Sequence, residues 1–166
     1  MYKGEQVMER VSKTNYYLDI AQAVARRSTC LRLKYGAIIV KDDSIVSTGY
    51  NGAPRGRANC SDLGSCTRAE LNIPHGQRYE LCRSVHAEQN AIIAASREEM
   101  IGATLYLVGL SAKDESLVSG CDSCMMCKRF VINSGIARVV IRDTETEYRV
   151  VEVADWVKND DLNTVK

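Results

Sequence analysis

The sequence predicts an α/β domain with helices on both faces of its sheet, and two patterns carry this prediction. Predicted strands alternate with predicted helices along the chain, which is typical of a sheet covered by helices. A β-hairpin pattern also occurs where GAIIV (36–40) meets SIVSTGYN (44–51) across Asp42 and Asp43. The length of 166 residues favours a single domain, so we expect one unit over 1–166.

Periodicity and capping residues predict the remaining elements. Residues 14–27 place apolar side chains at helical spacing, and Thr14 or Asn15 can cap that helix. Residues 53–85 lack periodicity, so we expect an irregular insertion, and loops this long are usually functional or held by a further interaction. The other expected helices are 87–98, 125–135 with Gly135 past its end, and 154–161; the other expected strands are 103–109, 137–143 and 148–153.

Composition excludes several classes of protein. The net charge of +1 gives no reason to expect general nucleic-acid binding or attraction to an anionic membrane. No apolar run approaches the roughly 20 residues that cross a bilayer. The polar segment MYKGEQVMERVSK lacks the apolar core of a signal peptide, so a cytoplasmic location is expected. Seven cysteines in such a protein favour metal binding or catalysis over disulfides.

Two motifs together indicate a catalytic metal site. SVHAEQNAI places His86 and Glu88 two residues apart at a predicted helix start, and SGCDSCMMCKRF carries Cys121, Cys124 and Cys127. Thiolates at this spacing can bind Zn²⁺ tetrahedrally, and one His with two Cys leaves a fourth position open for water. Zinc lowers the pKa of that water, and a nearby carboxylate that is not a ligand can carry the protons of a hydrolysis.

His-x-Glu followed by Cys-x-x-Cys is the signature of zinc-dependent nucleobase deaminases. Over residues 14–143 the sequence resembles the cytidine/deoxycytidylate deaminase superfamily. Within it, the chain is most similar to the deoxycytidylate (dCMP) deaminase family, through RRSTCLRLKYGAIIV, STGYNGAPRG, CRSVHAEQNAI and CMMCKRFVINSGIARVV in that order. The resemblance implies a three-layer α/β/α sandwich with a mixed central sheet. It also implies hydrolytic deamination of dCMP to dUMP and ammonia, which feeds thymidylate synthesis.

The resemblance also implies a role for each residue of the metal site. His86, Cys124 and Cys127 would hold zinc, and Glu88 would be the catalytic proton carrier, which leaves Cys121 as an extra thiol. Ser123 stands where the family usually has proline before the first ligand cysteine. Serine can cap the helix instead, so we expect a working site.

Substrate contacts are implied in the same way. Asn51 would reach the sugar, and the segment after the first helix would lie near the 5′-phosphate. The expected substrate-binding residues are Arg26, Ser28, Thr29, Asn51 and Ala87. The residues alone also allow plainer interpretations: Asn51 with Gly52 can be a turn, and Arg26 can be a cation at a helix C-terminus. Arg97 can be a surface charge or a contact to substrate or effector.

Four more candidate ligands fall in the insertion, at Cys60, Cys66, His75 and Cys82. They favour a structural zinc, which would tie down a loop that is otherwise costly in entropy. Similar insertions in dCMP deaminases carry a second zinc. Cys30 could replace His75 in such a site, and buried reduced thiols are the alternative.

The expected partners follow from the resemblance. They are a nucleotide substrate, dCTP and dTTP as effectors, and further copies of the chain, since the family forms homo-oligomers that are often hexamers. Two other functions stay open: a deaminase of another cytosine nucleoside, modified nucleotide or tRNA base, and a non-catalytic zinc-stabilised nucleotide-binding module. The net charge of +1 speaks against a tRNA substrate, and Ser123 is the feature that favours a module.

Overall fold

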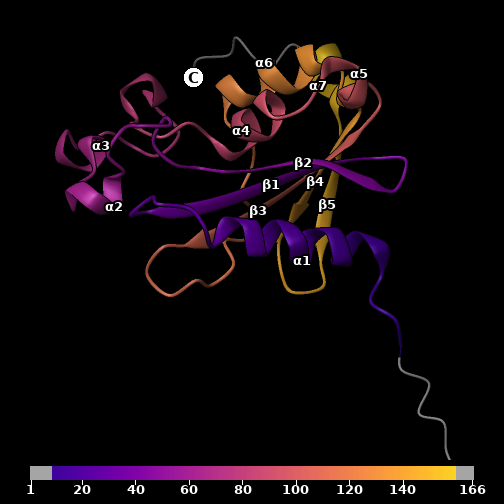
Figure 1. Cartoon of the computed structure of the whole chain (residues 1–166), viewed down its shortest axis with the longest axis horizontal. Helices are drawn as coiled ribbons and strands as arrows, with labels where there is room; N and C mark the ends of the chain where they lie inside the picture. Colours follow the sequence, from indigo (N-terminus) through magenta and orange to yellow (C-terminus); the bar gives the residue numbers. More distant parts are fainter. Residues whose placement is uncertain (1–8, 160–166) are drawn as a thin grey trace, which may run out of the picture.

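The computed structural model describes residues 9–159 (Figure 1). The strands are β1 (Leu33–Lys41), β2 (Ser44–Tyr50), β3 (Thr104–Ser111), β4 (Arg138–Arg142) and β5 (Tyr148–Glu152). The helices are α1 (Lys13–Ala25), α2 (Cys60–Leu63), α3 (Thr67–Glu70), the 3₁₀ helix η1 (Tyr79–Leu81), α4 (Ala87–Ile93), α5 (Arg97–Met100), α6 (Met125–Ser134) and α7 (Val153–Asn159). No described helix has the length and apolar character needed to cross a membrane.

The sheet is mixed, as the sequence predicts. Its strand order is β2-β1-β3-β4-β5. The β3–β4 pair is parallel, and the other pairs are antiparallel. A parallel pair needs a long crossover, and here α6 lies in that connection. The crossover therefore carries the predicted Cys-x-x-Cys motif from the end of β3 to one face of the sheet.

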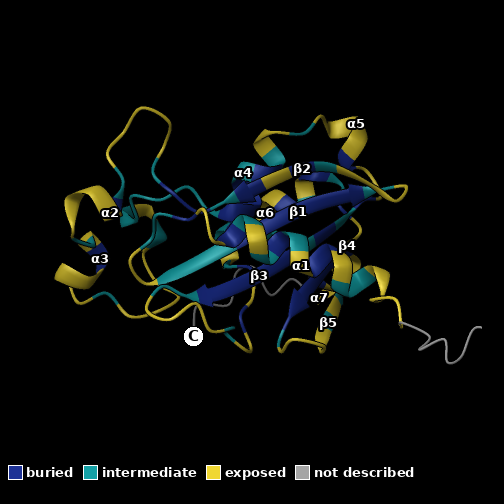
Figure 2. Ribbon diagram, turned by 60° about the horizontal axis from the view of Figure 1, so that its bottom comes forward, coloured by how far each residue is buried: buried dark blue, intermediate teal, exposed yellow. Residues whose placement is uncertain are grey.

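Alternating side chains of β1 build two separate cores, which gives the three predicted layers. Ile38 and Val40 face α1, where they pack with Leu18. Ala37 and Ile39 face the opposite side, in the core that includes α4, α6 and α7. Figure 1 shows α1 alone below the sheet and α4, α5, α6 and α7 above it. The short helices α2 and α3 lie at one end of the molecule and are largely exposed in Figure 2.

Two predicted helices differ from the observed ones. The first begins earlier than expected, because Ser12 caps it and accepts a hydrogen bond from the backbone N–H of Asn15 at 3.2 Å. The predicted helix 87–98 is instead two helices, α4 and α5. Ser96 interrupts it, since its hydroxyl accepts from the Glu99 N–H while the Glu99 carboxylate accepts from the Ser96 N–H. This capping box starts a new helix where periodicity alone predicts continuation.

Smaller differences concern the insertion and the ends of elements. The 53–85 segment is not wholly irregular, since α2, α3 and η1 lie within it. Gly135 ends α6 in the left-handed conformation at φ 84°, as expected for a C-terminal glycine. The predicted terminal helix 154–161 begins at Val153, and its last two residues lie outside the described part of the chain.

Close contact between β2 and α4 depends on Gly49. A Cβ atom at this position would lie 2.3 Å from both the carbonyl oxygen of Ala87 and the backbone nitrogen of Ala91. Both of those residues are fully buried alanines, so the helix backbone rests directly on the strand. The lack of a side chain at Gly49 therefore allows α4 to lie this close to the sheet.

We predict that Gly49→Ala destabilises the protein by about 1–3 kcal/mol or more, because α4 must move off the strand. Thr48→Ala, on the same strand but exposed, should change the free energy of unfolding by no more than about 0.5 kcal/mol. Denaturant unfolding of both variants measures the difference. Equal stabilities would show that α4 does not rest on β2 as described.

Candidate active site and metal centre

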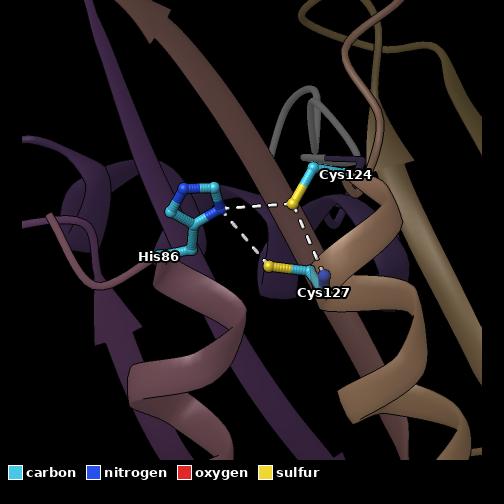
Figure 3. Close-up of side chains that lie close together, drawn as sticks. All are labelled: His86, Cys124 and Cys127. Carbon is cyan, nitrogen blue, oxygen red and sulfur yellow. Dashed lines mark hydrogen bonds between the residues drawn. The ribbon is translucent and has the colours of Figure 1, made fainter. Parts of the chain in front are cut away.

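The two predicted ligand motifs meet at two helix starts. His86 is the N-cap of α4, and its backbone N–H donates to the Gln89 side chain at 3.0 Å. Cys124 is the N-cap of α6, and its Sγ accepts from the backbone N–H of Cys127 at 3.4 Å. Figure 3 shows the imidazole of His86 facing both sulfur atoms. Residues about 40 positions apart in the chain thus converge on one point.

The separations of these atoms fit a tetrahedral zinc ion. His86 Nδ1 lies 3.4 Å from the Sγ of Cys124 and 3.4 Å from that of Cys127. Tetrahedral zinc bonds thiolate sulfur at about 2.3 Å and imidazole nitrogen at about 2.0 Å, which separates such atoms by about 3.5 Å. Within residues 9–159, no other group of three ligand atoms from His, Cys, Asp or Glu lies within 4.8 Å of one another.

The pKa values of these side chains also favour the binding of a cation. A hydrogen bond with Cys127 lowers the pKa of the Cys124 thiol well below its ordinary value, which favours the thiolate. Burial alone would lower the pKa of His86, but hydrogen bonds with the Cys124 and Cys82 thiols raise it to about 10. The Cys124 thiolate thus pairs with a protonated His86 at the N-terminus of α6, and a metal ion can replace the bound protons.

Glu88 is buried beside this group but does not belong to it. Its side chain is 4% exposed, and the carboxyl lies outside the cluster of three ligand atoms. Burial raises the pKa of Glu88 above its ordinary value. A carboxyl that takes up protons readily next to a metal site suits the role of a general acid and base.

The extra thiol of the motif, Cys121, lies apart from these ligands. Its Sγ packs against Gly109 of β3, 3.4 Å from the point that a Cβ atom on that glycine would occupy. Burial raises the pKa of Cys121 to about 11, so it is a neutral thiol at physiological pH. The structure therefore separates Cys121 from the ligand group, as the resemblance implies.

A cavity of about 520 Å³ opens over the site. This volume lies within the usual range for small-molecule pockets. His86, Glu88 and Cys124 lie in its wall, together with Asn51 and Ala87. The cavity therefore brings three metal-site residues and two of the predicted substrate contacts onto one surface.

The insertion closes one side of this cavity through residues that sequence reasoning missed. The ring of Tyr79 packs edge-on against the ring of His86, with centroids 4.9 Å apart. Arg68 also lies over the ring of Tyr79, 4.4 Å from its centroid, and donates to the carbonyls of Pro74 and Gln77. No periodic pattern in the insertion indicates these contacts. The insertion thereby supports the orientation of a predicted metal ligand.

Asn51 and Ser28 form one hydrogen-bonded unit. The Asn51 side chain accepts from the Tyr35 N–H at 2.7 Å and from the Ser28 hydroxyl at 2.6 Å, and donates to the Leu33 carbonyl at 2.9 Å. Asn51 is thus held rigidly at the cavity wall, with Ser28 behind it. Its contact with a sugar stays a prediction.

The remaining predicted substrate residues lie elsewhere. The hydroxyl of Thr29 donates to the Asn59 side chain at 3.0 Å. Arg26 is half exposed and pairs with Glu115 at 3.4 Å. Neither these two residues nor Ser28 is part of the cavity wall, and Arg97 is an exposed residue at the start of α5. Their predicted contacts with the phosphate or an effector stay predictions.

Three other cysteines lie near enough to Cys60 to influence its charge, although no three of these sulfur atoms lie within 4.8 Å of one another in the described structure. Burial raises the pKa of Cys60, and the neighbouring thiols of Cys30, Cys66 and Cys82 raise it further. His75 is exposed, so the thiol of Cys30 is the better fourth member of this cluster. We call Cys30, Cys60, Cys66 and Cys82 the thiol cluster.

Residues 11–143 match the cytidine and deoxycytidylate deaminase zinc-binding region. The chain belongs to the cytidine and deoxycytidylate deaminase family. Zinc is the cofactor of this family region, and His86, Cys124 and Cys127 fit it by ligand type and by separation.

Two deoxycytidylate deaminases share much of the sequence. Deoxycytidylate deaminase of Mycobacterium phage D29 is 41% identical over 138 residues, which cover 80% of this chain and 96% of the phage protein. Deoxycytidylate deaminase of Schizosaccharomyces pombe is 33% identical over 134 residues, which cover 79% of this chain and 37% of the yeast protein. The chain thus matches nearly the full length of the phage relative and well under half of the yeast one.

Solved structures show the same fold. The dCMP deaminase of cyanophage S-TIM5 superposes with a TM-score of 0.58 at 23% identity, covering 91% of this chain and 94% of that one. Cytidine deaminase from Burkholderia pseudomallei gives a TM-score of 0.55 at 18% identity, covering 84% and 92%. At these identities the likeness supports the fold alone, and it confirms the predicted cytidine deaminase-like architecture.

Proposed function

We propose that the protein is an enzyme that deaminates dCMP to dUMP and ammonia by zinc-dependent hydrolysis. The observation that carries this proposal is the group of ligands His86, Cys124 and Cys127, with buried Glu88 in the wall of the cavity that His86 and Cys124 also line. The 41% identity to the phage D29 deoxycytidylate deaminase supports dCMP as the substrate. The product dUMP is a precursor for thymidylate synthesis.

The chemistry divides between the metal ligands and Glu88. Zinc held by the three ligands would lower the pKa of a water molecule and so supply a nucleophile near neutral pH. The reaction adds this water at C4 of the cytosine ring and breaks the C4–N bond to the amino group. Glu88 takes a proton from the attacking water and delivers protons to the ring nitrogen and to the departing amine.

We predict that Glu88→Gln lowers kcat by about 10²–10⁴-fold, because the amide cannot carry a proton. Bound zinc per chain and the folded structure should persist, since Gln has nearly the same shape. Glu98→Gln, an exposed acid on α5, is the matched control and should leave kcat unchanged. Ammonia release from dCMP and metal analysis are the measurements. Loss of zinc in Glu88→Gln would instead make Glu88 a ligand.

Recognition of the 5′-phosphate needs a cation at the cavity. Arg32, Arg68 and Lys128 are the cationic side chains in its wall. Lys128 pairs with Asp122 at 3.0 Å, and Arg68 is buried with its Nη2 group donating to the carbonyls of Pro74 and Gln77. Arg32 is exposed. Arg32 is therefore the side chain of the cavity wall that is best placed to bind the phosphate. It lies six residues after Arg26, whose segment the resemblance places near the phosphate.

Arg32→Ala should lower kcat/KM for dCMP by about tenfold or more, since a charge-assisted hydrogen bond contributes about 1.5–3 kcal/mol. Turnover of deoxycytidine, which lacks the phosphate, should change little. Arg26→Ala tests the contact that the resemblance implies, and if Arg32 holds the phosphate it should leave the preference for dCMP intact. The opposite pattern would assign the phosphate to the Arg26 segment, and equal turnover of dCMP and deoxycytidine by the unmodified protein would exclude dCMP as the specific substrate.

The thiol cluster supports a second, structural zinc in the insertion. Cys30, Cys60, Cys66 and Cys82 supply the ligand type that closed zinc sites use, and a metal ion would have to draw their sulfur atoms together, since no three of them lie within 4.8 Å of one another in the part of the chain that the structure describes. A metal there would link β1, where Cys30 lies just ahead of the strand, to α2, α3 and the segment before His86. This would tie the insertion to the catalytic part of the fold.

Purified protein should contain two zinc ions per chain, and Cys60→Ala should contain one. The same substitution should lower the thermal midpoint, because the insertion loses its cross-link. His75→Ala, which changes an exposed residue of the same segment, should keep both ions and the thermal midpoint. A single zinc per chain in fully active unmodified protein would rule out the second site.

Two further expectations rest on the family resemblance, and a third, the location, rests on the polar segment MYKGEQVMERVSK. Assembly into a homo-oligomer, regulation by dCTP and dTTP, and a cytoplasmic location stay predictions. A nucleotide substrate without general nucleic-acid binding agrees with the net charge of +1.

A further inference from the structure

Ser123 carries a buried hydroxyl whose hydrogen-bonding capacity is unused. The residue is 3% exposed, and its Oγ has no hydrogen-bond partner among the described residues. Its backbone N–H is satisfied by the side chain of Asp122 at 2.8 Å, so only the hydroxyl is left over. A buried hydroxyl without a partner is unfavourable, and such a group in a native protein calls for an explanation.

The hydroxyl does not cap α6, although serine at this position suggested that role. The N-cap of α6 is Cys124, whose Sγ accepts from the Cys127 N–H at 3.4 Å. Ser123 precedes the cap, and the residue is part of the cavity wall. Helix capping therefore does not account for the residue.

The functional group that matches this hydroxyl is the carboxyl of Glu88. Both residues lie in the wall of the same cavity, and both are nearly fully buried. Glu88 follows His86 by two residues and Ser123 directly precedes Cys124, and the His86 Nδ1 and Cys124 Sγ atoms lie 3.4 Å apart, so the chain brings the two side chains to the same part of the cavity wall. The hydroxyl of Ser123 can donate a hydrogen bond, and the carboxylate of Glu88 can accept one.

We propose that Ser123 is a positioning residue whose O–H donates a hydrogen bond to the Glu88 carboxylate. The bond holds one carboxylate oxygen and leaves the other free to receive and deliver protons. It acts through the orientation of Glu88, so it affects the rate of the chemical step more than substrate binding. This role rests on the proposed deaminase function.

The test compares Ser123→Ala and Ser123→Pro in the zinc-loaded full chain. Both variants lack the hydroxyl, and proline is the residue that favours a helix start. In each, kcat for dCMP should fall by about tenfold or more, with KM within about twofold and bound zinc unchanged. The matched control is Ser134→Ala, a buried serine of α6 whose hydroxyl donates to the Val131 carbonyl at 2.8 Å; its kcat should stay unchanged.

Three kinetic or binding results would overturn the proposal. Ser123→Ala with unchanged kcat would show that the hydroxyl is not used. Ser123→Pro at or above the unmodified rate would show that serine only shapes the entry to α6. Loss of zinc from Ser123→Ala would show that the residue supports the ligands and not Glu88.

A crystal structure of the zinc-loaded protein gives a test that does not depend on turnover. The Oγ of Ser123 should lie within hydrogen-bond distance, about 2.5–3.0 Å, of a Glu88 carboxylate oxygen. A longer distance would contradict the proposal even if dCMP is turned over. Absence of dCMP turnover in the unmodified protein, with this hydrogen bond present, would count against the proposed substrate and leave the contact in place.

Discussion

The site depends on the convergence of two helix starts, α4 and α6, over one face of the sheet. His86 caps the first helix and Cys124 caps the second, so both ligands sit at positions that the backbone fixes. Their atoms come within 3.4 Å because both helices pack on the same core. Gly49 and the buried alanines of α4 set how closely that helix approaches the strand. A shift of either helix by about 1 Å would spoil ligand geometry, which tolerates about 0.2 Å.

Burial of polar and ionisable side chains in this region lowers the stability of the folded protein and favours catalysis. Glu88 is a carboxyl with almost no solvent contact, and the sulfur atoms of Cys124 and Cys127 each lie 3.4 Å from the imidazole of His86. The unpartnered hydroxyl of Ser123 lies in the same wall. Groups that raise the free energy of the folded state gather at functional sites, because the surrounding structure holds them there. The two cores on either side of β1 supply that support.

Sequence patterns predicted the parts of the fold that depend on local chemistry. The apolar run of β1, the turn after it and the Cys-x-x-Cys spacing each depend on neighbouring residues, and each is found where expected. The break between α4 and α5 was missed, because the Ser96–Glu99 capping box competes with an otherwise continuous helical pattern. Contacts across the insertion could not be predicted at all. Whether Ser28 faces a phosphate or Asn51, and whether Tyr79 meets His86, is decided by tertiary packing.

The central claim is that one zinc ion is bound by a nitrogen and two sulfurs, with Glu88 beside it and unbound. Anomalous diffraction at the zinc edge from crystals of the purified protein tests this directly. The account predicts a peak about 2.0 Å from His86 Nδ1 and about 2.3 Å from the sulfurs of Cys124 and Cys127, with a fourth position free of protein ligands. A peak with a Glu88 oxygen at bonding distance, or no peak at these three residues, would contradict it.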